Sequence, residues 1–138
     1  MITIRLWHKD LIEVLPRQQL LGQWRELNSI YKKQDKHILI NFVYDYDFGH
    51  LLGYTNMVIA EMENRGYKMN LENAKNYFDP LIRNAQGFKM PFYENLFEEK
   101  MNERYLKQCL YNLQEKYDCG GISQEEWQKI EDKFGGVM

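Results

Sequence analysis

Apolar side chains recur at three- and four-residue steps through much of the chain, and this spacing limits the possible folds more than any other feature. Between Pro16 and about Lys33 such positions share one helical face. They are Leu20, Leu21, Trp24, Leu27 and Tyr31. Pro16 suits the first turn of a helix, where its missing N–H costs no hydrogen bond. The pattern therefore predicts a long helix that ends near Lys33.

A second long helix is predicted from about Phe48 to Arg65. Its inward positions are Leu51, Leu52, Thr55, Val58, Ile59 and Met62. Gly66 stands where a left-handed residue ends a helix, and Tyr67 can then pack back on the last turn. A shorter helix is expected from Asn70 to just before Pro80, followed by a loop over residues 80–90.

The C-terminal part shows the helical pattern again. A stretch from Pro91 to about Tyr117 has a break near residues 101–102, and Gly120-Gly121 ends it. Its apolar positions are Phe92, Leu96, Phe97, Leu106, Leu110, Leu113 and Tyr117, with Cys109 also expected in the core. The last helix has a capping box at Ser123 and Glu126 and a hydrophobic staple between Ile122 and Trp127. Trp127, Ile130 and Phe134 form its inward face, and Gly135-Gly136 terminates it.

Residues 37–46 are rich in β-branched and aromatic side chains, which by themselves suggest a strand. No partner strand is evident, so we expect a buried extended segment or a short helical turn. The fold class predicted for residues 1–138 is therefore all-α, a single compact multi-helix domain.

The composition excludes several classes of protein. Hydrophobic residues make up 44% and charged residues 28% of the 138 residues, which is typical of a globular domain and argues against disorder. No apolar run approaches the roughly 18 residues of a membrane span. The opening Met1–Arg5 is too short and too charged for a signal peptide. Cys109 and Cys119 are expected to be reduced thiols in a cytoplasmic protein.

The net charge of −2 is unevenly distributed. Residues 1–37 hold seven Lys or Arg and four Asp or Glu, a charge of +3, whereas the remainder carries −5. A basic N-terminal face permits contact with nucleic acid without requiring it.

Sequence motifs for other chemistries are absent. The chain has no phosphate-binding glycine loop, His-Glu-x-x-His, Cys-x-x-Cys or Gly-x-Ser-x-Gly. Asp45, Asp47 and His50 could gather a metal ion, but Asp47 is equally well explained as a helix cap. We therefore expect no metal site.

Trp24-Arg25-Glu26 is the cluster of residues best suited to take part in a reaction. A carboxylate near Arg5, Arg17 and Arg25 would stay ionised and could stabilise a developing cation, while the arginines hold phosphates. An ordinary surface ion pair is the alternative interpretation. Gly22, one turn before Glu26, lets either a ligand or a neighbouring helix approach the backbone.

Two segments resemble the pyrimidine-dimer DNA glycosylases of the phage endonuclease V type. The first is Arg17-Gln-Gln-Leu-Leu-Gly-Gln-Trp-Arg-Glu-Leu27, and the second runs from His50-Leu through Tyr54 to Glu61-Met-Glu-Asn-Arg-Gly-Tyr67. The opening Arg5-Leu-Trp-His8 is similar to a bacterial branch of relatives. The resemblance covers about the first half of the chain.

The resemblance implies a mainly helical, single-domain DNA repair enzyme. Such enzymes attack C1′ of a damaged nucleotide with an N-terminal amine, form an imine and cleave the strand by β-elimination, without metal or other cofactor. It implies that Glu26 stabilises the cationic sugar and moves protons, and that Arg25 contacts the substrate. The implied partner is damaged double-stranded DNA. Gln18 matches a family position, and the expected DNA-binding residues are Arg5, His8, Arg17 and Gln18.

The chain also departs from the family pattern. The family's His in this region is Gln19 here, and its exposed Thr amine has no counterpart, because alignment through Glu26 places Arg5 near that Thr. The amine would have to come from Met1, Lys9 or a processed Thr3. The basic, aromatic DNA-binding segment expected at the C-terminus is also missing, and the end is acidic. A relative that lost the nucleophile and only binds DNA or another protein is therefore the alternative prediction.

Overall fold

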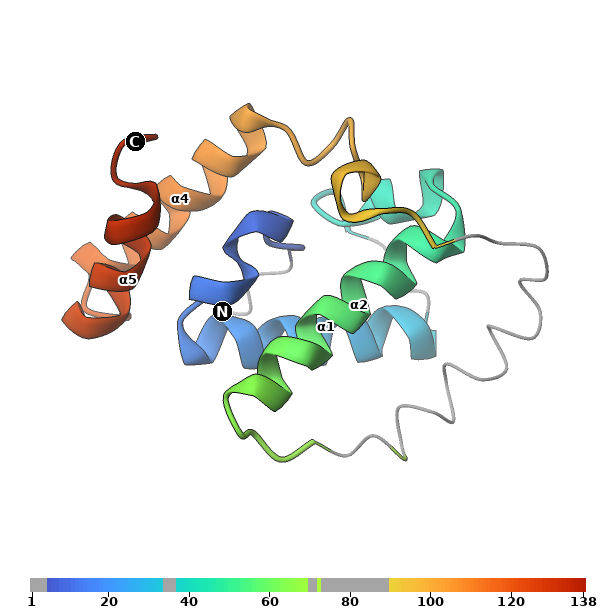
Figure 1. The fold of residues 1–138 in the computed structure, drawn as a ribbon, viewed down its shortest axis with the longest axis horizontal. Coiled ribbons are helices and arrows are strands. Elements are labelled where there is room, and N and C mark those ends of the chain that lie inside the picture. The colour runs from blue at the N-terminus through green and yellow to red at the C-terminus, as the bar shows by residue number, and fades with distance from the viewer. Residues whose placement is uncertain (1–4, 34–36, 70–71, 73–89) are drawn as a thin grey trace.

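The computed structural model describes residues 5–33, 37–69, 72 and 90–138 of the chain (Figure 1). Its α-helices are α1 (Arg17–Lys33), α2 (Phe48–Asn64), α4 (Glu103–Asp118) and α5 (Gln124–Phe134). Its 3-10 helices are η1 (Lys9–Val14), η2 (Asn41–Asp45) and η3 (Tyr93–Asn95). The described residues contain no β-strand, and the all-α prediction is confirmed.

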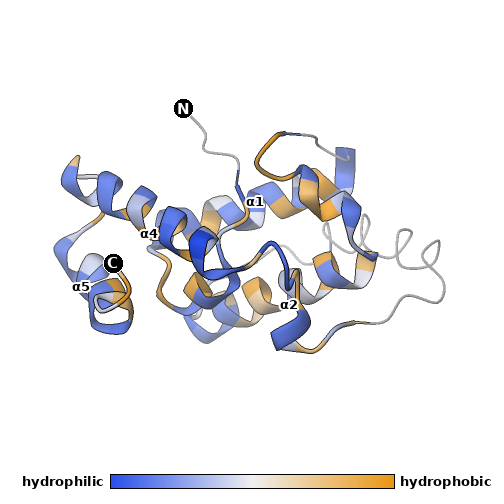
Figure 2. Ribbon diagram, turned by 90° about the horizontal axis from the view of Figure 1, so that it is seen from above, coloured by the Kyte–Doolittle hydropathy of each residue, from blue (hydrophilic) through white to orange (hydrophobic). Residues whose placement is uncertain are grey.

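The helices pack around the N-terminal segment. Helix α1 packs on α2, and η1 contacts both α2 and α5, while α4 packs on α5. Figure 1 shows the α4–α5 pair on one side of the N-terminal segment and α1 and α2 on the other. The α-helices are apolar on one side and polar on the other, as the colours in Figure 2 show. This arrangement leaves the polar side of α1 accessible beside the N-terminal segment.

The two long helices begin and end close to the predicted residues. The inward face of α1 consists of Leu20, Gln23, Leu27, Ile30 and Tyr31. Leu21 and Trp24, predicted to be inward, are only partly buried, and Gln23 is buried in their place. Gly66 has a φ of +78°. The Tyr67 N–H donates to the Met62 carbonyl and the Gly66 N–H to that of Glu63, so α2 ends in the predicted glycine motif.

The prediction of a helical stretch beginning at Pro91 was wrong for residues 91–101. Only η3 is helical there, and Phe92 is 79% exposed. Phe97 is fully buried with a φ of +50°, and its N–H donates to His50 Nδ1 at 2.9 Å. Phe42 and Tyr46 contact the Phe97 ring edge-on. Burial of Phe97 in this aromatic cluster favours a backbone that a continuous helix could not adopt.

The segment over residues 37–46 forms a short helical turn, one of the two predicted alternatives. Ile40 and Val43 are buried there, whereas Ile38 is 85% exposed. The short helix predicted from Asn70, and the loop predicted over residues 80–90 apart from Met90, lie outside the described residues.

The C-terminal helices follow their local sequence signals. Asn102 caps α4 by accepting a hydrogen bond from the Tyr105 N–H, which confirms the predicted break near residues 101–102. The capping box of α5 is present, and its inward side chains are Trp127, Ile130 and Phe134, as predicted. Cys109 lies in the core. Among the described residues, no helix has the length and apolar character needed to cross a membrane.

Candidate functional site

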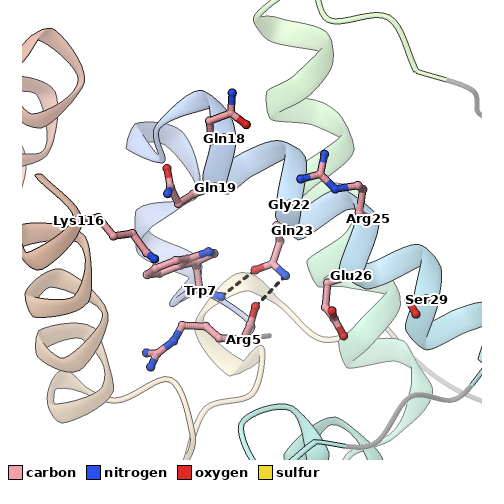
Figure 3. Close-up of a pocket in the computed structure, with 10 residues that line it drawn as sticks. All are labelled: Arg5, Trp7, Gln18, Gln19, Gly22, Gln23, Arg25, Glu26, Ser29 and Lys116. Carbon is pink, nitrogen blue, oxygen red and sulfur yellow. Dashed lines mark hydrogen bonds between the residues drawn. The ribbon is translucent and has the colours of Figure 1, made fainter. Parts of the chain in front are cut away.

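A pocket of about 460 Å³ lies along the polar face of α1, and we call it the α1 pocket. It is bounded by α1, the N-terminal segment and α4 (Figure 3). Its lining residues are Arg5, Trp7, Gln18, Gln19, Gly22, Gln23, Arg25, Glu26, Ser29 and Lys116. The α1 members recur mostly at three- and four-residue steps because such positions share one face of a helix.

Arg25 and Glu26 lie toward the C-terminal end of this helical face, close to Ser29. Gly22, one turn earlier, offers no side chain, and a Cβ atom built there would lie 3.7 Å from Arg25 Nη2. Among the described residues, no neighbouring helix lies within 4 Å of that position, so the structure favours access to the pocket over helix packing as the role of Gly22. The helix places both side chains along the same border of the cavity.

The N-terminal segment is attached to α1 by the side chain of Gln23, which is 2% exposed. Gln23 Oε1 accepts from the Trp7 N–H at 2.8 Å, and its Nε2 donates to the Arg5 carbonyl at 3.1 Å. The Tyr54 hydroxyl lies 2.6 Å from the Trp7 carbonyl and 2.8 Å from Gln23 Oε1. We call these contacts among Arg5, Trp7, Gln23 and Tyr54 the Gln23 clamp.

The clamp places Arg5 at the border between α1 and α4. Its guanidinium carbon lies 5.6 Å from the centre of the Trp7 ring and 6.0 Å from that of Tyr105. Its Nη1 donates to Cys109 Sγ at 3.6 Å. Burial raises the pKa of Cys109, so the thiol stays neutral at pH 7 and leaves the positive charge of Arg5 uncompensated from that side. Arg5 therefore contributes a fixed cation to the α1 pocket.

His8 and Arg17 are not brought into the α1 pocket. His8 is 3% exposed, and its Nδ1 accepts from the Asp10 N–H at 3.1 Å. Burial lowers the pKa of His8, so its ring is neutral near pH 7. Arg17 lies at the first residue of α1, and its guanidinium lies 4.8 Å from the centre of the Tyr67 ring. One residue turns a helix by about 100°, so Gln18 faces the pocket and Arg17 does not.

Lys9, one of the predicted nucleophiles, is held away from the pocket. Its Nζ donates to the carbonyls of Tyr93, Glu94 and Leu96 at 2.6, 3.3 and 3.0 Å. The ammonium thus serves backbone acceptors in and just after η3. Burial lowers the pKa of Lys9. The other two predicted amines, on Met1 and Thr3, lie outside the described residues.

Sequence reasoning assigned no functional role to four of the lining residues, which are Trp7, Gln23, Ser29 and Lys116. Gln23 interrupts an apolar face, a signal that could have marked it as a buried polar group. Lys116 belongs to α4, far from Glu26 in sequence, and no local pattern connects the two. With Arg5, Arg25 and Lys116 against Glu26, the pocket lining has a formal charge of +2, although the whole chain carries −2.

In the described parts of the chain, no three His, Cys, Asp or Glu side chains come together as metal ligands. Of the residues considered for such a site, His50 accepts a hydrogen bond from the Phe97 N–H.

The family model described as pyrimidine dimer DNA glycosylase matches residues 4–74, just over half of the chain. The matched part contains the N-terminal segment, α1 and α2, and with them every lining residue of the α1 pocket except Lys116. Neither the curated proteins nor the solved structures gave a match.

Proposed function

The chain belongs to the pyrimidine dimer DNA glycosylase family, and we propose that it is a DNA repair glycosylase and abasic-site lyase acting on damaged pyrimidines in double-stranded DNA. The observation that carries this proposal is the α1 pocket, which holds Arg25 and Glu26 together with Arg5 and Gln18. These are four of the six residues expected from the sequence to act on DNA.

Each of these side chains has a defined role in the proposed reaction. The Glu26 carboxylate stabilises positive charge that develops on the deoxyribose and transfers protons during imine formation and β-elimination. Arg25 binds a phosphate oxygen beside the reacting sugar, Arg5 supplies positive charge to the strand on the α4 side of the pocket, and Gln18 contributes a neutral hydrogen-bonding group. An amine attacks C1′ of the damaged nucleotide, the C1′–N bond to the pyrimidine breaks, and the base is released from the sugar as the imine forms; at an abasic site water leaves instead. Removal of a C2′ proton and loss of the 3′ phosphate by β-elimination then cut the strand.

We further propose that residues 1–138 act as one domain, in the cytoplasm and without a metal or other cofactor. Lys116 of α4 supports the single domain, because it lines the same pocket as the α1 residues even though it lies outside the part of the chain that matches the family.

Borohydride trapping tests the proposal. Borohydride reduces an imine to a stable amine, so an active protein becomes covalently joined to a duplex that contains an abasic site or a pyrimidine dimer. We expect Glu26→Gln to slow trapping and strand cleavage by at least about 100-fold. The control is Glu63→Gln, which removes an exposed carboxylate from α2 and is expected to leave both rates unchanged.

Mass spectrometry of the adduct identifies the amine, and a variant that starts at Thr3 shows whether a shorter N-terminus reacts better. The position of Lys9 favours one alternative function, a DNA-recognition protein without a nucleophile, because its amine is bound by three carbonyls away from the pocket. Tight binding of damaged duplex without an adduct in any variant would support that alternative. No binding and no adduct at low salt would contradict both.

A further inference from the structure

Helix α4 forms the second wall of the α1 pocket. Tyr105, Cys109 and Lys116 lie four and then seven residues apart, so they share one face of α4. Tyr105 and Cys109 contact the guanidinium of Arg5, which shows that this face is turned toward the N-terminal segment. Lys116 continues the face by two turns and lines the pocket, with its side chain directed toward Trp7 in Figure 3.

Lys116 and Glu26 lie at different ends of the pocket. Figure 3 shows Lys116 near Gln19 and Trp7, and Glu26 near Ser29 on the other side of Gln23. The lining positions of α1 run from Gln18 to Ser29, a span of about 16 Å at a rise of about 1.5 Å per residue. Phosphates on one strand of B-DNA follow each other every 3.4 Å or so along the helix axis. The pocket is therefore longer than one nucleotide.

The charge of the pocket suits a polyanion. Three cationic side chains and one carboxylate line it, and the cations stand on both walls and at both ends. The Lys116 ammonium lies apart from the Glu26 carboxylate, which is proposed to act on the sugar. The ammonium is therefore suited to bind a neighbouring phosphate and poorly placed to attack C1′.

We propose that the α1 pocket holds the backbone of one DNA strand beyond the damaged nucleotide, and that Lys116 binds a phosphate of that strand one or more nucleotides from the sugar at Glu26. This inference rests on the proposed function, because it takes DNA as the ligand. It gives α4, outside the matched part of the chain, a direct share in substrate binding.

Neutralising one phosphate at a time tests the position of Lys116. The probe is a duplex with a tetrahydrofuran abasic analogue, which lacks the C1′ hydroxyl and cannot form an imine. Single methylphosphonates remove the charge of successive phosphates on each side of the analogue. We expect one position, displaced from the analogue, at which neutralisation weakens binding of the unmodified protein about tenfold and that of Lys116→Ala hardly at all.

Two further variants separate phosphate contact from structural support. Lys116→Arg keeps the charge and should restore both affinity and sensitivity to that position. Lys107→Ala is the matched control, since Lys107 is also on α4 but pairs with Glu103 at 3.8 Å and does not line the pocket. It should behave as the unmodified protein does. For Lys116→Ala alone, the slope of log affinity against log salt should become shallower by about 0.9.

The outcomes distinguish the two proposals. If the unmodified protein binds and is trapped on damaged duplex while Lys116→Ala responds to every methylphosphonate as the parent does, the inference is wrong and the proposed function stands. If the unmodified protein neither binds damaged duplex at low salt nor forms an adduct, both are wrong.

Discussion

Two regions border the α1 pocket, the N-terminal segment and the α4–α5 pair, and each is held in place by a different kind of contact. The N-terminal segment lies on α1 and α2 through the Gln23 clamp, a set of buried hydrogen bonds. The α4–α5 pair is joined mainly by apolar and aromatic contact: Tyr117 stacks on Trp127 with ring centres 5.2 Å apart, and Ile130 is fully buried.

This difference affects how accurately each region can position a functional group. Hydrogen bonds are directional, so the Gln23 clamp fixes the backbone of Arg5 and Trp7 relative to Glu26. Apolar contact is not directional and tolerates small shifts. The wall that carries Arg5 is therefore expected to be the more rigid one, and the wall that carries Lys116 the more adaptable. Loss of a clamp residue should also be more costly than loss of a surface cap on α5.

The largest effect is expected from Gln23→Ala. The substitution leaves the Trp7 N–H and the Arg5 carbonyl without their partner, and each buried unsatisfied group costs about 1–3 kcal/mol. We expect the free energy of unfolding to fall by about 3 kcal/mol, measured by urea denaturation. Gln23→Leu, which restores volume but no hydrogen bond, should be almost as unstable.

Gln18→Ala is the control for this prediction, because Gln18 lies on the same helix and is exposed. It should change the unfolding free energy by no more than about 0.5 kcal/mol. A Gln23→Leu protein as stable as the parent would show that Gln23 acts by packing, and the contrast between the two regions would disappear.

The same contrast explains what the sequence can predict. Signals that act within a few residues are readable: the glycine that ends α2 and the capping box of α5 are where the sequence places them. The hydrogen bonds of the Gln23 clamp join residues that are separated by 16, 18, 31 or 47 positions in the sequence. Such separations leave no periodic pattern that could be read beforehand. Gln18, Arg25 and Glu26 were predictable as pocket residues because they lie on one helix, and Arg5 was predicted as a basic residue near Glu26. The places of His8, which lies beside Tyr105 of α4, and of Lys116 depend on how α4 packs, and no local sequence pattern shows that packing.

A moderate effect confined to the C-terminal region is expected from Ser123→Ala. The Ser123 hydroxyl accepts from the Glu126 N–H at 3.1 Å, and loss of such a cap costs about 1 kcal/mol. Hydrogen exchange should become faster for the first amides of α5 and stay unchanged for the Trp7 amide in the Gln23 clamp. Ser123→Asp should restore protection. Equal loss of protection at Trp7 would mean that the two regions unfold as one unit.

The smallest effect is expected from Glu126, which connects α5 with the start of α1. Its Oε2 accepts from the Arg17 N–H at 2.8 Å and its Oε1 from the Ser123 N–H at 3.2 Å, so one carboxylate serves the first turns of α1 and α5. Burial by itself would raise the pKa of Glu126, but the donors from Arg17 and Ser123 outweigh it, and the pKa is lowered. An anion at a helix N-terminus contributes about 0.5 kcal/mol when it is near the surface.

Because the pKa of Glu126 is lower in the folded chain, its contribution is complete above the usual value of 4.5 and is lost as the pH falls through the folded value. Glu126→Gln should therefore lower stability by about 0.5 kcal/mol at pH 7 and show a flatter decline in urea midpoint between pH 5 and 3. Glu125→Gln is the matched control, since Glu125 also lies in the first turn of α5. If both variants lose stability with acid in the same way, the bond to Arg17 adds nothing beyond the field of α5. A flatter decline for Glu126→Gln alone would show that the Glu126 carboxylate, which joins α1 to α5, is the group whose protonation weakens the fold in acid.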